Sequence, residues 1–83
     1  MNAGYPEGWE EVDGALERTF RCKDFAAAID FVNRVAELAE AENHHPDIGI
    51  RWNLVTLRFR THSEDAITGR DVALAERTGR LAG

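Results

Sequence analysis

Residues 24–46 read DFAAAIDFVNRVAELAEAENHHP and carry the strongest periodic pattern in the chain. Asp24 is a suitable N-cap, Asn43 is an acceptable stop signal, and Pro46 prevents a helix from continuing. The apolar residues between them recur at three- and four-residue steps, which places them on one face of a long helix. These residues are Phe25, Ala28, Ile29, Val32, Val35, Ala36 and Ala39. The opposite face carries Asp30, Arg34, Glu37 and Glu40.

Two strands are predicted before this helix. Residues 9–12 could form a short strand, and the hairpin dipeptide Asp13-Gly14 follows them. Beyond this turn the chain has a period of two, which is typical of a half-buried strand. The alternation sets Leu16, Arg18, Phe20 and Cys22 against Glu17, Thr19 and Arg21.

Two more strands are predicted after the helix. The first begins with the alternation of Ile48 and Ile50, and the break near Trp52-Asn53 indicates a tight turn or a bulge. The next strand has the clearest alternation and is expected to end at His62. It sets Val55, Leu57, Phe59 and Thr61 against Thr56, Arg58, Arg60 and His62.

A second helix is predicted to begin near Thr68. Thr68 and Asp71 stand three apart as a capping box, and Ile67 can pack on Val72 as a hydrophobic staple. We expect three side chains of this helix to face inward, namely Val72, Ala75 and Leu81.

The predicted order is therefore strand, strand, helix, strand, strand, helix. Each helix has a single apolar stripe to bury, so the natural arrangement is a four-stranded, mostly antiparallel sheet with both helices on one face. This is an α+β fold. Its 83 residues fit one domain, 1–83, in which we expect residues 1–8 to be flexible.

Composition excludes several classes of function. The net charge is −5, with 10 Lys and Arg scattered among 15 acidic residues, so we expect no direct binding to nucleic acid. The apolar segments are too short to span a membrane, and the N-terminus lacks the regions of a secretory signal. The expected compartment is the cytoplasm. Cys22 is the single cysteine, which excludes an internal disulfide and a Cys-rich zinc site.

The three histidines all lie at the ends of predicted elements. His44 and His45 close the long helix, and His62 closes the clearest strand. An imidazole can donate and accept protons near neutral pH, so a cleft formed there could perform acid–base chemistry. The helix dipole alone could also explain His44 and His45, and His62 could simply face water at the end of an edge strand. Three histidines also fit a catalytic zinc site, although adjacent histidines diverge and rarely bind one ion.

The neighbours of the histidines leave further alternatives open. Glu40 stands four residues before His44, so on a helix the two side chains could interact. The capping box alone could explain Asp71. Trp52 could be a core residue or a stacking surface. Arg58 and Arg60 could line a solvated sheet face or hold an anionic group of a ligand.

The spacing Glu40-x3-His44-His45-Pro46-x5-Trp52-x9-His62-x8-Asp71 resembles the signature of the pterin-4a-carbinolamine dehydratase family. The resemblance covers roughly residues 8–77. It extends to Gly8-Trp9, the Phe20…Phe25 segment, Val35-Ala36…Ala39-Glu40, Thr61-His62 and Asp71-x2-Leu74-Ala75. Two departures stand out. Many relatives have an extra N-terminal helix, and relatives usually have Gly where this chain has Ala66.

The resemblance implies a hydro-lyase that removes water from 4a-hydroxytetrahydropterin and gives quinonoid dihydropterin. It implies no metal, no cofactor, a role in recycling the cofactor of aromatic amino acid hydroxylases, and a homodimer or homotetramer. By position, His44, His45 and His62 would be catalytic, with His45 chiefly orienting the pterin. The remaining substrate-binding positions would be Glu40, Pro46, Thr61, Ser63, Glu64 and Asp71.

Two other functions compete with this expectation. The same fold could serve as a dimerisation or assembly cofactor without catalysis, because relatives with such roles are known. The three histidines could also serve a zinc hydrolase.

Overall fold

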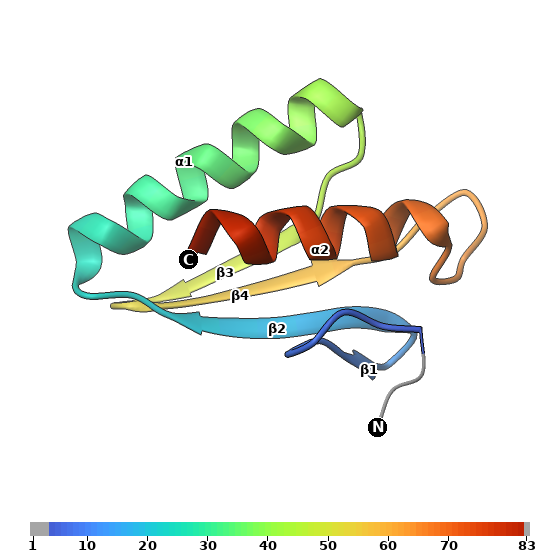
Figure 1. The fold of residues 1–83 in the computed structure, drawn as a ribbon, viewed down its shortest axis with the longest axis horizontal. Coiled ribbons are helices and arrows are strands. Elements are labelled where there is room, and N and C mark those ends of the chain that lie inside the picture. Colours follow the sequence, from blue (N-terminus) through green and yellow to red (C-terminus); the bar gives the residue numbers. More distant parts are fainter. Residues whose placement is uncertain (1–3, 83) are drawn as a thin grey trace.

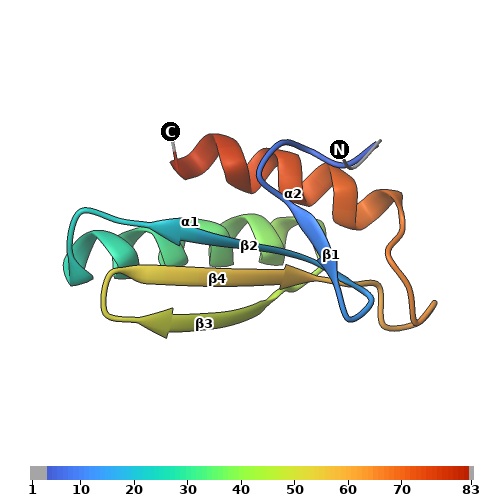
Figure 2. The same ribbon diagram turned by 90° about the horizontal axis from the view of Figure 1, so that it is seen from below.

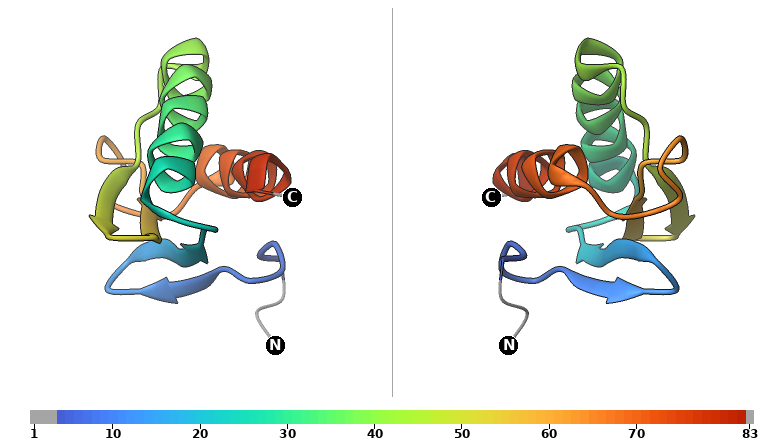
Figure 3. Two further views of the ribbon diagram at one scale, coloured as in Figure 1. Left: turned by 90° about the vertical axis from the view of Figure 1, so that its left-hand side faces the viewer. Right: turned by 90° about the vertical axis from the view of Figure 1, so that its right-hand side faces the viewer.

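Six elements follow one another in the computed structural model, which describes residues 4–82. Both helices lie on one side of the sheet, as Figures 1 and 3 show. The α+β class and the order of elements predicted from the sequence are confirmed. The elements are β1 (Glu10–Val12), β2 (Ala15–Arg21), α1 (Phe25–Glu42), β3 (Asp47–Arg51), β4 (Leu54–Phe59) and α2 (Gly69–Ala82).

The sheet has the strand order β1-β2-β4-β3, and all three pairings are antiparallel (Figure 2). Only Trp52 and Asn53 separate β3 from β4, so the predicted break is a tight turn. Two expectations about β4 were wrong. It ends at Phe59, short of His62, and it is an inner strand with β2 on one side and β3 on the other. The strand stops early because Thr61 pairs with Ala66 within its own loop.

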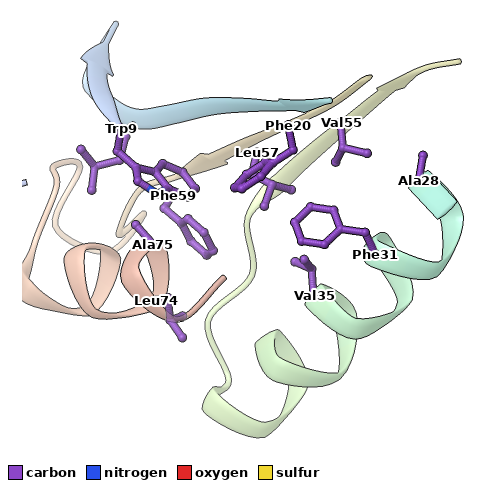
Figure 4. Close-up of a cluster of buried hydrophobic side chains, with 11 residues drawn as sticks. Trp9, Phe20, Ala28, Phe31, Val35, Val55, Leu57, Phe59, Leu74 and Ala75 are labelled. Atoms are coloured by element: carbon purple, nitrogen blue, oxygen red, sulfur yellow. The ribbon is translucent and has the colours of Figure 1, made fainter. Parts of the chain in front are cut away.

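The core lies between the sheet and the two helices (Figure 4). The alternation predicted for β4 is confirmed, because Val55, Leu57 and Phe59 are buried. Trp9 lies 5.7 Å from Phe59 between ring centroids. Burial of one large apolar side chain contributes about 1.5–3 kcal/mol, so these inward-facing residues are the main source of stability.

The buried stripe of α1 differs from the predicted one. Ala28, Val35 and Ala39 are buried as expected, and Phe31 joins them although the prediction did not include it. Phe25 is 51% exposed and Ala36 is exposed. The stripe is rotated toward Phe31, because the helix presents the larger ring to Phe20 at 4.8 Å.

In α2 the three side chains expected to face inward do so, because Ala75 is buried and the half-buried Val72 and Leu81 pack against the core. The sequence pattern missed Leu74, which is buried. Residues 1–3 of the segment expected to be flexible lie outside the described residues. In the remainder, the Tyr5 hydroxyl donates to Glu11 Oε1 at 3.0 Å.

No helix within residues 4–82 is long and apolar enough to cross a membrane.

Candidate active site

The end of α1 sets the position of the first histidine. Asn43 adopts a left-handed conformation with φ of 52°, which reverses the chain. The amide of His44 then donates to the carbonyl oxygen of Ala39 at 3.1 Å, and the amide of Asn43 donates to the Glu40 carbonyl oxygen at 3.3 Å. This bond pattern is a Schellman motif. It directs the His44 side chain back toward α2 and away from the axis of α1.

His44 is held by a carboxylate from the first turn of α2. Its Nε2 lies 2.6 Å from Asp71 Oδ1, and both side chains are buried. The imidazole also stacks on Phe59 with 6.3 Å between ring centroids. Because the carboxylate accepts the Nε2 proton, Nδ1 is the nitrogen left with a lone pair. The arrangement resembles the carboxylate–imidazole pairs that orient catalytic bases.

Asp71 is itself fixed by two further hydrogen bonds. Its Oδ2 accepts from the Thr61 hydroxyl at 2.8 Å and from the Thr68 amide at 2.9 Å. The Thr68 hydroxyl lies 2.7 Å from Thr61 Oγ1. Since the single Thr61 proton points to Asp71, Thr68 must donate to Thr61. The carboxylate half of the predicted capping box is therefore present, whereas the Thr68 hydroxyl accepts from the Arg70 amide at 3.3 Å and not from the Asp71 amide. The same carboxylate also positions His44.

Glu40 was expected to interact with His44, but it contacts His45 instead. The Nε2 of His45 lies 2.5 Å from Glu40 Oε2 on an exposed surface. The predicted interaction of Glu40 with His44 was wrong, because α1 ends at Glu42 and the helical i,i+4 rule does not extend to residue 44. An exposed ion pair of this kind contributes at most about 1 kcal/mol, so Glu40 holds its partner less firmly than Asp71 holds His44.

His62 begins a short loop that is closed by the pairing of Thr61 with Ala66. The amide of Asp65 donates to the His62 carbonyl oxygen at 3.1 Å. The positive φ of this loop falls on Asp65, at 52°, and Ala66 is not among the residues with positive φ. The Ala at position 66 is therefore compatible with this turn. The His62 side chain is exposed at the cavity described next.

A cavity of about 360 Å³ brings most of the predicted site residues together. Its lining includes His44, His45, Pro46, Thr61, His62 and Ser63. Asp71 lies behind His44 and Glu40 behind His45, whereas Glu64 is exposed in the loop outside the lining. The sequence prediction missed Asn43, Asp47 and Arg70, which also line the cavity. Arg70 directly precedes Asp71 at the start of α2. The predicted capping box, which places Asp71 there, was the sequence signal that could have indicated Arg70 as a lining residue.

A cavity of about 380 Å³ lies elsewhere, between β2, the start of α1 and the end of α2. It contains no histidine, so we place the candidate site at the cavity that His44, His45 and His62 line together. Within residues 4–82, no group of three or more His, Cys, Asp or Glu side chains could hold a metal ion.

Three further residues that the sequence suggested as ligand contacts lie outside the lining of the histidine cavity, namely Trp52, Arg58 and Arg60. Trp52 is 69% exposed at the β3–β4 turn, so it is not a core residue. Arg58 pairs with Glu17 at 2.6 Å, and Arg60 pairs with Asp65. These ion pairs support the solvated-face interpretation of both arginines.

The fold and the site define a small α+β protein with a histidine-lined, solvent-open cavity. The family model described as "Pterin 4 alpha carbinolamine dehydratase" matches residues 2–81. A protein of Mycolicibacterium vanbaalenii named "Putative pterin-4-alpha-carbinolamine dehydratase" is 52% identical over 77 residues, which are 90% of this chain and 83% of that protein. A protein of Mycobacterium avium with the same name is 49% identical over 85 residues, at 100% and 90% coverage. The chain belongs to the pterin-4a-carbinolamine dehydratase family.

Two solved structures are similar in fold. One is a transcriptional coactivator/pterin dehydratase from Brucella melitensis, with a TM-score of 0.88, 37% identity, and coverage of 93% of this chain and 84% of that one. The other is a pterin dehydratase-like protein described as a RuBisCO assembly factor in the alpha-carboxysome. Its TM-score is 0.74 at 22% identity, with coverage of 90% and 87%, and this likeness concerns the fold alone.

Proposed function

We propose that the protein is a 4a-hydroxytetrahydropterin dehydratase. The observation that carries the proposal is the buried His44–Asp71 pair at 2.6 Å beside a cavity that His62 also lines. A base of defined tautomer and a second, exposed imidazole are the groups that a dehydration needs. Membership in the family supplies the substrate class.

The reaction removes one molecule of water. The C4a–O bond of the substrate breaks, and the hydroxyl leaves with an added proton as water. The N5–H proton is lost to a base, and its bonding electrons form the C4a=N5 double bond of quinonoid dihydropterin. Each positioned acid or base typically contributes about 10²–10⁴-fold to the rate.

Each side chain has a proposed role. His44 takes the N5 proton through Nδ1, and the exposed His62 delivers a proton to the leaving hydroxyl and exchanges it with solvent. His45, oriented by Glu40, binds and orients the pterin. Pro46, Thr61, Ser63 and Glu64 contribute to the pocket wall. The reaction needs neither a metal nor a cofactor, and its expected setting is the cytoplasmic recycling of the pterin used by aromatic amino acid hydroxylases.

A specific surface favours self-association, as a homodimer or homotetramer. Every residue of the edge strand β3 is exposed, including Ile48 at 39% and Ile50 at 38%, and Trp52 follows at the turn. An exposed apolar edge strand is a template for pairing with another chain. The same edge would carry the function of a dimerisation or assembly cofactor, which is the second candidate.

The dehydration of freshly generated 4a-hydroxytetrahydropterin, followed by ultraviolet absorbance, tests the proposal. Wild-type protein should accelerate the reaction, and His44→Ala and His62→Ala should each lower kcat by about 10²-fold or more. Full turnover by His44→Ala would overturn the assignment of the base. A folded wild-type protein that gives no acceleration would exclude the enzyme and favour the assembly cofactor.

A further inference from the structure

The cavity of about 380 Å³ between β2, the start of α1 and the end of α2 gathers positive charge, and we call it the basic cavity. The chain has a net charge of −5, yet none of the described residues that line this cavity is Asp or Glu. Arg21 alternates with the buried Phe20 along β2, so its side chain lies on the opposite face of the sheet. The three remaining basic residues of the lining are Arg18, Lys23 and Arg34.

Two guanidinium groups of the basic cavity lie against the end of α2. Arg34 Nη1 donates to the Leu81 carbonyl oxygen at 3.2 Å. Arg18 Cζ lies 4.3 Å from the centroid of the Phe20 ring, and a Cβ atom at Gly79 would come within 3.3 Å of Arg18 Nη1. The glycine therefore leaves room for a guanidinium group that the aromatic ring holds in place.

The positive charge of this cavity is not neutralised by carboxylates. Within residues 4–82, Arg18 and Lys23 form no ion pair, and Arg34 has only a 3.9 Å contact with the exposed Asp30. The C-terminal end of a helix attracts cations, but it carries only about half an elementary negative charge. A half-buried charge such as that of Arg18 is normally paired, so the cavity has an excess of positive charge that an anion could balance.

The wall behind these cations is apolar. Phe20 and Phe31 are both buried, with 4.8 Å between their ring centroids (Figure 4). The half-buried Cys22 and Ala27 continue the lining. Pockets that bind small molecules typically combine an apolar wall with a few polar groups and measure about 300–1,000 Å³. The basic cavity agrees with this description in both size and composition.

We propose that the basic cavity binds a small organic carboxylate whose apolar body packs against the aromatic wall. The planar guanidinium groups of Arg18 and Arg34 suit the two oxygens of a carboxylate, and the exposed Lys23 adds a third positive charge. An inorganic anion would leave the apolar wall in water, and a neutral ligand would leave the cations without a partner. Among the described residues, none lines both this cavity and the histidine cavity, so the inference does not depend on the proposed function.

Isothermal titration calorimetry at low ionic strength with three probes tests the proposal. The first, 2-naphthoate, carries a carboxylate on an apolar double ring. The second, 2-naphthamide, has nearly the same shape without the charge, and inorganic phosphate has the charge without the apolar body. Naphthoate should bind at least about tenfold more tightly than either, because only it makes both the charge-assisted hydrogen bonds and the apolar contact. Equal affinity for the amide or for phosphate, or no saturable binding of naphthoate, would overturn the inference.

Two substitutions connect this binding to the cations of the cavity. Lys23→Gln and Arg34→Gln should each weaken naphthoate by about threefold to tenfold and leave the amide unchanged. Lys23 is exposed and has no ion pair to lose, so its replacement tests the site without affecting the fold. Arg51→Gln is the matched control, since it removes an exposed arginine at the end of β3, outside the lining. An equal loss in the control would contradict the proposal.

Cys22 shows where the probe binds, because it is the single cysteine of the chain and lines the basic cavity. Saturating naphthoate should slow the alkylation of this thiol by iodoacetamide by about fivefold or more, since the reaction depends on access to the sulfur. The pterin 7,8-dihydrobiopterin should not displace naphthoate. An unchanged alkylation rate, or displacement by the pterin, would place the probe at another site and overturn the inference.

Discussion

Asp71 joins the start of α2 to the proposed base His44. It is fully buried, and its two oxygens accept hydrogen bonds from the His44 imidazole, the Thr61 hydroxyl and the Thr68 amide. A buried polar group left without its partner costs about 1–3 kcal/mol. The side chain therefore links the stability of α2 to the tautomer of His44.

Asp71→Asn should separate these two tasks. The amide oxygen can replace Oδ2 and keep the bonds from Thr61 and Thr68. The amide nitrogen then faces His44 Nε2 and donates to it, which moves the imidazole proton to Nδ1 and removes the base. We expect kcat to fall by about 10²-fold or more, with little change in Tm. Nitrogen-15 spectra of the histidine should show the tautomer change.

Glu40→Gln is the control for this change, because it alters the exposed His45 pair in the same chemical way. It should mainly raise KM, because Glu40 orients the His45 side chain that binds the pterin, and it should lower kcat far less than Asp71→Asn does. Unchanged activity in a folded Asp71→Asn variant would show that His44 does not act through Nδ1.

At the scale of elements, periodicity predicted β2, β4 and the two helices because each of them has one buried face. The edge strand β3 has no buried residue, and it was predicted from the alternation of Ile48 and Ile50. Periodicity missed the buried Phe31 and Leu74. More than one stripe of each helix is apolar enough to face the core, and which stripe is buried depends on how the helix packs on the sheet.

The candidate site was predictable only in part. The positions of His44, His45 and His62 at the ends of elements, together with the family resemblance, predicted that they would gather. The pairing of His44 with Asp71 depends on the Schellman turn and on how α2 docks.

The two helix caps provide a matched test of how α2 supports the site. Thr68→Ala removes a hydroxyl that accepts from the Arg70 amide and donates to Thr61, so it should lower stability by about 1 kcal/mol and also reduce kcat. Asp24→Ala removes the cap that accepts from the Ala27 amide at 2.8 Å, far along α1 from His44. It should lower stability by a similar amount and leave kcat unchanged. Thermal unfolding and turnover distinguish them, and equal effects on kcat would contradict the coupling.

The β3–β4 turn contains a residue whose backbone conformation should lower the stability of the protein. Trp52 has φ of 52°, where a side chain other than glycine costs about 1–2 kcal/mol, and its ring is 69% exposed. Trp52→Gly should therefore be more stable than Trp52→Ala, because both lose the ring and only glycine relieves the backbone. Urea unfolding of the two variants measures the difference. Equal midpoints would mean that the turn carries no strain.

At the scale of the whole molecule, one face of the sheet is covered by helices while the β3 edge is exposed to solvent. Both helices cover one face of the sheet (Figure 1). The β3 edge carries the exposed Ile48 and Ile50, and the exposed Trp52 follows at the turn. A chain of 83 residues buries only about 60–65% of its unfolded surface. Association at this edge would add buried apolar area to a small core.

Ile50→Lys should prevent the proposed self-association, because a lysine on an edge strand opposes pairing with another chain. Sedimentation velocity at several concentrations should show wild type larger than a monomer and the variant as a monomer. Ala36→Lys adds the same charge on exposed α1 and should not change the sedimentation coefficient. A wild-type protein that is monomeric at every concentration would exclude self-association.

The bond from the Thr68 amide to Asp71 also makes a natural reporter of occupancy. A ligand that touches His44 changes the charge that Asp71 faces, and the hydrogen bond carries that change to the Thr68 amide proton. The Thr68 resonance should therefore shift when the cavity fills, while its solvent exchange slows. An unlabelled pterin could be titrated against this one signal without fluorescent groups or chemistry at the pocket.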